Sequence, residues 1–202
     1  MPNSPDLFRQ EKKVLIIGIT GATGSIYGVR LLEVLSTMNN VETHLIISEA
    51  GEMTIKYELD RGLDEVRELA TYCYNIKEIG SGPASGSFKR DGVVIAPCSV
   101  KTMSALANSY DDNLLIRAGD VSLKERKKLV LLVRETPLHL GHLRSMERLC
   151  EMGATILPPV PAFYHRPKTI LDIVDHTIGR VLDIFEIEHN LFPRWSGIGG
   201  QE

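Results

Sequence analysis

The stretch that most constrains the fold runs from residue 14 to residue 30 and reads VLIIGITGATGSIYGVR. It begins with a short apolar run, mostly β-branched, which is typical of a strand buried on both faces. Glycines then recur at positions 18, 21, 24 and 28, and apolar residues follow at helical spacing. This order of strand, tight turn and helix aims the free N–H groups of a helix start at an anion, most often a phosphate. We therefore expect a phosphate-binding turn, with an ordinary packing turn as the alternative. The pattern is not G-x-G-x-x-G, so it does not specify a dinucleotide.

Composition places the chain among globular α/β proteins. Its 202 residues suffice for one such domain with a sizeable core, and a net charge of −3 gives no reason to expect nucleic acid. No apolar run is long enough to cross a bilayer, so we expect no membrane partner. The first residues, MPNSPDLFRQEKK, lack a hydrophobic signal core. We expect polar tails at 1–12 and 196–202 around a single domain at 13–195.

The spacing of cysteines and histidines argues against disulfide bonds and against a metal site. Cys73, Cys98 and Cys150 are widely spaced and odd in number, which argues against a disulfide framework and fits a reducing cytoplasm. The only close histidine pair, His139 and His142, has no third ligand nearby, so we expect no metal site.

Strand-like and helix-like runs alternate along the rest of the chain. A loop rich in Gly, Ser and Pro separates them at 80–92, and long loops of this kind are often functional or mobile. The alternation predicts a mostly parallel, doubly wound sheet with helices on both faces. The predicted strands after the first are 41–47, 93–96, 129–133 and 154–157, and the predicted helices after the first are 49–59, 63–72, 103–107, 138–152 and 170–185.

Polar side chains follow five of the predicted strands. In a doubly wound sheet the ligand lies beyond the carboxyl ends of the strands, so these groups are expected on one edge. Hydroxyls and charges at five strand ends exceed what packing requires. They are Thr23, Ser48, Ser99 to Thr102, Arg134 with Glu135, and Tyr164.

Several longer motifs resemble one family. They are GITGATGSIYGVRLLEVL, ASGSF, VIAPCSVKT, DNLLIRAGDVSLKERKKLVLLVRETP and PPVPAFYHRP, and the match that they anchor covers nearly the whole chain from Lys13 to Trp195. They resemble the flavin prenyltransferases, the UbiX-like proteins, some of which are B subunits of aromatic-acid decarboxylase systems. The resemblance implies a flavodoxin-like Rossmann fold and a homo-oligomer, typically a dodecamer.

The resemblance also implies the reaction. Dimethylallyl phosphate, or the pyrophosphate in some members, alkylates reduced FMN at N5, and a second bond to C6 closes a fourth ring, without a metal. The prenylated flavin then serves a UbiD-type decarboxylase.

The family's functional positions map onto this chain by motif. The implied catalytic residues are Thr23, Glu58 and Glu135. The implied FMN-binding residues are Gly21, Ala22, Thr23, Ser48, Ser99, Val100, Lys101, Thr102 and Arg134. The implied prenyl-phosphate clamp is Arg117, Lys124, Tyr164 and Arg180, with Trp195 as a late aromatic residue. One departure is G-A-T-G where the family commonly has G-A-S-G: threonine keeps the hydroxyl but adds a methyl group and restricts χ1. Decarboxylase-associated members also carry threonine.

The residue types suit this chemistry. A departing allylic phosphate develops negative charge, which arginine forks and a lysine point charge stabilise. Glu135 is the best-placed proton donor and acceptor by motif.

Plainer interpretations stand beside these roles. Arg117 and Lys124 also fit surface or subunit contacts, Tyr164 also fits simple packing, and Glu58 also fits an exposed helix position. Cys98 is better explained as a small buried hydrophobe than as a nucleophile. The pair His139 and His142 fits a helix surface, whereas His165 and His176 receive no role.

Two other functions compete with the transferase. The first is a flavin-dependent decarboxylase acting directly on a carboxylate, as in proteins that oxidatively decarboxylate cysteine. Those proteins typically have a P-A-S-A-N-T-type run where this chain has PCSVKT at 97–102. The second is a non-catalytic FMN carrier, which has no need of a second phosphate clamp. Both comparisons favour the transferase.

Overall fold

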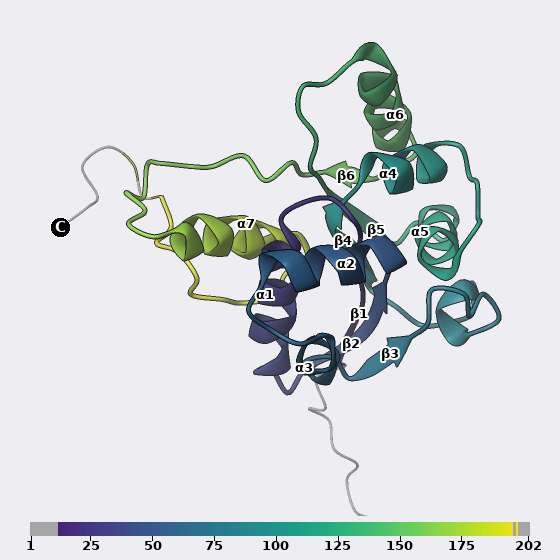
Figure 1. The fold of residues 1–202 in the computed structure, drawn as a ribbon, viewed down its shortest axis with the longest axis horizontal. Coiled ribbons are helices and arrows are strands. Elements are labelled where there is room, and N and C mark those ends of the chain that lie inside the picture. Colours follow the sequence, from purple (N-terminus) through teal and green to yellow (C-terminus); the bar gives the residue numbers. More distant parts are fainter. Residues whose placement is uncertain (1–11, 196, 198–202) are drawn as a thin grey trace, which may run out of the picture.

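A parallel six-stranded sheet forms the centre of the molecule (Figure 1). The computed structural model describes residues 12–195 and 197, so the two predicted tails fall almost wholly outside the described residues. The strand order is β3-β2-β1-β4-β5-β6, and every neighbouring pair is parallel. The strands are β1 Lys13–Ile19, β2 Val41–Ile47, β3 Tyr72–Tyr74, β4 Gly92–Cys98, β5 Lys128–Val133 and β6 Thr155–Ile156.

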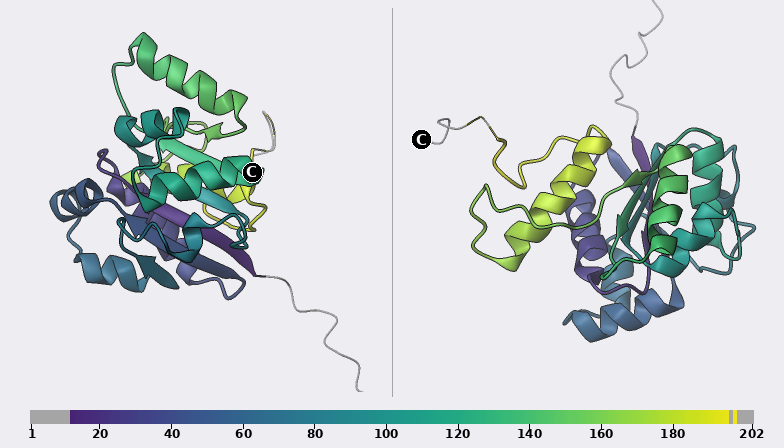
Figure 2. Two further views of the ribbon diagram at one scale, coloured as in Figure 1. Left: turned by 90° about the vertical axis from the view of Figure 1, so that its right-hand side faces the viewer. Right: turned by 90° about the horizontal axis from the view of Figure 1, so that it is seen from above.

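Helices cover both faces of the sheet (Figure 2). Helices α1, α2, α3 and α7 pack on one face, and α4, α5 and α6 pack on the other. Within the described residues, no helix is long and apolar enough to cross a membrane. The helices are α1 Ser25–Ser36, α2 Glu49–Glu58, α3 Leu63–Glu68, α4 Val100–Ala107, α5 Leu114–Lys124, α6 Leu140–Glu151 and α7 Ile170–Ile184, with a 3₁₀ turn at Gly82–Ala84.

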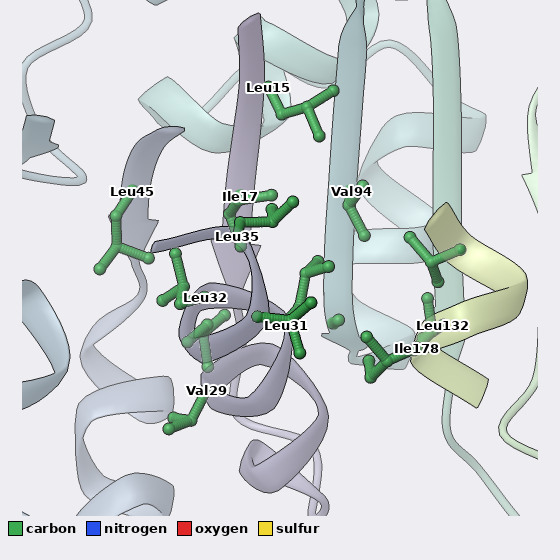
Figure 3. Packing of buried hydrophobic residues seen from close by; sticks show 14 of the residues in the cluster. Leu15, Ile17, Val29, Leu31, Leu32, Leu35, Leu45, Val94, Leu132 and Ile178 are labelled. Atoms are coloured by element: carbon green, nitrogen blue, oxygen red, sulfur yellow. The ribbon is translucent and has the colours of Figure 1, made fainter. Parts of the chain in front are cut away.

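Alternating side chains of the central strands build two cores. In β1, Leu15 and Ile17 point toward α1 and α7, whereas Ile16 joins the core beneath α4 and α5. Figure 3 shows the first core, where Leu31 and Leu35 of α1 meet this face of the sheet. Burying each such side chain contributes about 1.5–3 kcal/mol to folding. The prediction of a first strand buried on both faces is confirmed.

The sequence interpretation missed edge strand β3. It predicted a helix over 63–72, but α3 ends at Glu68 and Tyr72–Tyr74 pairs with β2. The reason is a tertiary contact, because Thr43 and Thr71 exchange hydrogen bonds between backbone N and side-chain Oγ1 at 3.1 and 3.0 Å. Local helical propensity gives way to this pairing. Without β3 the strand order is that of flavodoxin, so the predicted fold class is confirmed.

Two further boundaries differ near the predicted ligand edge. Strand β4 continues through Pro97 to Cys98, with a shift in its register against β5, instead of ending at Ala96. Helix α4 begins at Val100 instead of residue 103, because the Ser99 side chain accepts a hydrogen bond from the Thr102 N–H and caps it. The polar run 99–102 is therefore the first turn of a helix.

Candidate active site

The strand order reverses direction between β1 and β4, where a doubly wound sheet opens a crevice for ligand. The buried side chain of Thr20 joins the two strand ends there. Its Oγ1 donates to the Pro97 carbonyl at 2.7 Å and accepts from the Ser99 N–H at 2.8 Å. Thr20 was not among the predicted site residues. Its position as a hydroxyl residue within the glycine turn could have indicated a role. It fixes the spacing of the two strand–turn–helix junctions.

A pocket of 530 Å³ lies at this reversal point, lined by the starts of three helices. Ser48 caps α2, Ser99 caps α4 and Asn113 caps α5, each through a side-chain oxygen that accepts a backbone N–H. Three positive helix ends favour an anionic group. The lining residues are Gly21, Ser48, Glu49, Ala50, Ile76, Lys77, Ser99, Lys101, Thr102, Asp112, Asn113 and Leu115.

Five of the predicted FMN-binding residues therefore meet in one pocket: Gly21, Ser48, Ser99, Lys101 and Thr102. Of the others, Ala22 and Thr23 belong to the same turn as Gly21, and Val100 packs partly against the core. The sequence interpretation missed the wall formed by Ile76, Lys77 and the 112–115 segment. Ile76 and Lys77 follow the unpredicted strand β3, so their place on this edge could not be anticipated.

Both lysines of the pocket are paired with exposed carboxylates. Lys77 Nζ lies 2.7 Å from Glu49 Oε1, and Lys101 Nζ lies 3.6 Å from Asp112 Oδ2. Exposed pairs of this kind contribute little to stability, so a bound anion competes readily for either lysine.

The first helix start is filled by the chain's own carboxylate. Glu58 accepts hydrogen bonds from the Gly24 N–H at 2.9 Å, the Ser25 N–H at 2.8 Å and the Ser25 hydroxyl at 2.8 Å. The sequence predicts a phosphate at this turn, and the structure places the Glu58 carboxylate on the Gly24 and Ser25 N–H groups of the α1 start. The glycine turn contributes to the neighbouring pocket through Gly21.

Thr23 and Glu58, two of the predicted catalytic residues, are brought together by the same arrangement. Partial burial raises the pKa of Glu58, but hydrogen bonds from Thr23, Ser25 and Gly24 outweigh it and hold the pKa below 4.5. Glu58 is therefore ionised at neutral pH.

Arg134 and Glu135 follow β5 on the same edge of the sheet as the pocket. The Arg134 N–H donates to the Cys98 carbonyl at 3.2 Å, and Glu135 Oε1 accepts from the Thr136 N–H at 2.8 Å. Both residues are exposed. The sequence predicted that both residues lie at the carboxyl edge of the sheet, and the structure places them there.

Arg117 and Lys124 lie on α5. Arg117 Nη1 is 2.8 Å from Asp111 Oδ2 and 3.5 Å from Asp120 Oδ2. Lys124 is the last residue of α5, and it lines a separate basic pocket with Lys128, the first residue of β5. Lys124 therefore lies at the amino edge of the sheet, away from the pocket at the carboxyl edge.

Tyr164, Arg180 and Trp195 gather around α7. The Tyr164 hydroxyl lies 2.7 Å from His176 Nε2, and the Tyr164 and Trp195 rings meet edge to face with centroids 5.7 Å apart. Arg180 Nη1 lies 3.0 Å from Asp183 Oδ2. Because α7 and α5 cover opposite faces of the sheet, one chain divides the predicted clamp into two groups (Figure 1).

Comparison with known proteins identifies the family. The model of the Flavoprotein family matches residues 4–190. The flavin prenyltransferase UbiX of Thauera aromatica is 54% identical over 183 residues, covering 91% of this chain and 94% of the relative. This chain belongs to the flavin prenyltransferases. It is therefore a transferase, as the motifs predicted.

Two solved structures share the fold closely. AnUbiX (PadA1), in complex with FMN and dimethylallyl pyrophosphate, has a TM-score of 0.90 at 45% identity and covers 93% of this chain and 99% of its own. A dodecameric FMN-dependent UbiX-like decarboxylase from Escherichia coli O157:H7 has a TM-score of 0.89 at 46% identity, covering 91% of this chain and 100% of its own.

His176 contacts Tyr164, a predicted clamp residue, and the sequence interpretation gave it no role. It is buried on α7 one helical turn before Arg180, and its ring stacks on His165 with centroids 5.0 Å apart. Burial, and then the charges of His165 and Arg180, lower the pKa of His176 below 6.5, while Asp183 opposes them. The neutral imidazole then bonds the Tyr164 hydroxyl. The position of His176 four residues before Arg180, a predicted clamp residue, places both on one face of a helix and could have indicated this role.

Proposed function

We propose that this flavin prenyltransferase joins a dimethylallyl group from dimethylallyl phosphate to reduced FMN, forming bonds at N5 and C6. The domain at 13–195 carries the reaction, and the prenylated FMN serves a UbiD-type aromatic-acid decarboxylase in the cytoplasm. The observation that supports the proposal is the separation of two groups of residues suited to anions: a pocket walled by three helix starts, and arginines on α5 and α7 elsewhere on the chain.

The pocket residues fit FMN by their chemistry. Ser48, Ser99 and Thr102 offer hydroxyls at two helix starts, which suits a terminal phosphate, and Ile76 and Leu115 offer apolar wall. Reduced FMN supplies the nucleophilic ring positions when it is bound. In our proposal, the three hydroxyls with Lys101 and Arg134 hold its phosphate. Their role is binding and orientation.

The donor phosphate is held by the clamp. Arg117, Lys124 and Arg180 supply positive charge, and the Tyr164 hydroxyl donates a hydrogen bond. Their attraction for the phosphate oxygens grows as the allylic bond breaks and negative charge develops, so they lower the barrier. Glu135 exchanges a proton at the departing phosphate. Trp195 closes the apolar side of the site and helps to exclude water.

Thr23 and Glu58 act together at the edge of the flavin pocket. Glu58 is held by the α1 start, and Thr23 is among the groups that lower its pKa, so the carboxylate lies close to the threonine hydroxyl. We assign Thr23 to orienting the reacting groups or relaying a proton, and Glu58 to fixing Thr23.

The divided clamp supports a homo-oligomer in which one copy completes the site of another. Large apolar side chains lie exposed on α2 and α6, among them Met53, Tyr57, Leu140 and Leu143. Exposed apolar surface of this kind is a common feature of subunit interfaces. A dodecamer like that of the E. coli O157:H7 relative is the assembly we propose.

Anaerobic incubation with reduced FMN and dimethylallyl phosphate tests the function. Mass analysis of the extracted flavin should show the addition of one dimethylallyl group, and the purified chain alone should release no carbon dioxide from aromatic acids. Unmodified flavin would contradict the proposal. Carbon dioxide release by the chain with FMN alone would support the direct decarboxylase instead.

A further inference from the structure

The segment after α7 folds back along that helix, as the yellow tail in Figure 2 shows. Gly179 permits the close approach. A Cβ at this position would lie 2.3 Å from Cε1 of Phe192 and 2.6 Å from Cε1 of His189, distances that real side chains do not adopt. The surface of α7 is therefore shaped to receive residues 189–192.

Asp183 lies one helical turn after Gly179 and gathers three donors. Its Oδ1 is 2.6 Å from Arg194 Nη2 and 3.2 Å from His189 Nε2, and its Oδ2 is 3.0 Å from Arg180 Nη1. The Leu191 N–H donates to His189 Nδ1, so the ring proton is on Nε2 and points to Asp183. One carboxylate thus connects the helix to two points of the tail.

Two of the groups that Asp183 holds connect it to the proposed donor site. Arg180 is a clamp residue, and Arg194 directly precedes Trp195, whose ring meets Tyr164 edge to face. We propose that Asp183 is a positioning residue of the donor site. It fixes Arg180 directly and, through Arg194 and His189, fixes the tail that places Trp195 against Tyr164. Its consequence for prenyl transfer rests on the proposed function.

The physical basis is a shared, mostly buried charge. Partial burial raises the pKa of Asp183, but Arg194 and His189 outweigh burial and lower it below 3.8, so the carboxylate is ionised at neutral pH. Arg180 uses Nη1 for this contact and keeps further N–H groups for a fork onto phosphate oxygens. Holding the guanidinium in advance reduces the ordering that binding would otherwise require.

Asp183→Asn tests the proposal, because it keeps the shape and removes the charge. Trp195 is the only tryptophan, so its fluorescence reports tail docking without any ligand. In the flavin-free variant, we expect emission at longer wavelength and stronger acrylamide quenching. We expect KM for dimethylallyl phosphate to rise about tenfold with kcat less affected, in line with loss of one charge-assisted contact. FMN affinity should stay within about twofold.

Asp175→Asn is the matched control on the same helix. Asp175 binds Arg30 of α1 through two hydrogen bonds of 2.6 and 3.1 Å, away from the tail. It should lower stability but leave Trp195 fluorescence and KM unchanged. Equal changes in both variants, or no change in Asp183→Asn, would overturn the positioning role. A fluorescence change in Asp183→Asn together with a parent enzyme that prenylates no flavin would leave Asp183 in place and overturn the proposed function.

Discussion

The proposed flavin pocket and the proposed donor clamp are organised differently in this chain. The pocket residues lie at the ends of neighbouring strands, so folding of one chain brings them together around 530 Å³. The clamp residues lie on α5 and on or against α7, and these two helices cover opposite faces of the sheet. We therefore expect a single folded chain to bind the flavin. We expect use of the prenyl donor to require the assembled oligomer.

The two regions also differ in how their cations are held. The pocket lysines have exposed single partners, which a ligand can replace. The clamp arginines are anchored by less exposed carboxylates: Arg117 by Asp111 and Asp120, and Arg180 by Asp183. If the clamp assignment holds, this anchoring restricts the arginines before the donor phosphate binds, which suits charge stabilisation in a transition state.

The largest expected effect comes from removing clamp charges. Lys124→Ala or Arg180→Ala should reduce use of dimethylallyl phosphate by about ten- to a hundred-fold, the value of a charge-assisted contact, while FMN binding stays unchanged. Steady-state kinetics and FMN titration measure the two effects.

Mixing these two variants sharpens the comparison. Oligomers assembled from coexpressed Lys124→Ala and Arg180→Ala chains should regain activity, because some sites then combine the intact residue of each chain. If mixed oligomers are no more active than the two pure variants, the clamp is not shared between copies.

Thr102→Val tests the proposed flavin pocket. Losing a hydroxyl that contacts a phosphate should weaken FMN binding about tenfold and leave KM for dimethylallyl phosphate unaffected. Titration of flavin fluorescence measures this. Thr54→Val is the control, because Thr54 bonds only within α2, to the Ala50 carbonyl at 2.8 Å. A rise in KM for dimethylallyl phosphate with unchanged FMN binding would contradict the assignment of Thr102 to the flavin pocket.

Glu58→Gln should cost about 1 kcal/mol of unfolding free energy at neutral pH, as loss of a charged helix cap does. The pKa of Glu58 is below 4.5 in the folded chain, so its contribution is present above that value and is lost as pH falls through the folded pKa. Thermal unfolding at several pH values should show the parent and variant converging in acid. A constant difference across the range would contradict the capping role.

His176→Gln should give the smallest effect. The pKa of His176 is below 6.5 because of burial, His165 and Arg180, against Asp183, with Tyr164 as its bonded partner. Its stabilising contribution is therefore complete above 6.5 and falls as pH drops below it. The parent should lose stability more steeply than the variant just below pH 6.5. Parallel curves would show that His176 does not titrate there.

The sequence by itself determined the class of fold and most of the flavin pocket. Alternation of strands and helices fixes a doubly wound sheet, and such a sheet brings Ser48, Ser99 and Thr102 to one edge wherever the loops run. Motif resemblance named the clamp residues. These features are local in sequence or follow from strand direction alone.

The tertiary structure decided what depends on distant partners. Glu58 at the α1 start, Thr20 between two strands and edge strand β3 all rest on contacts between residues 28 to 77 positions apart. Asp183 and His176 gained roles only when the tail and the 158–167 loop packed on α7. A side chain's partner across the chain is set by packing and hydrogen-bond satisfaction, which no local pattern encodes.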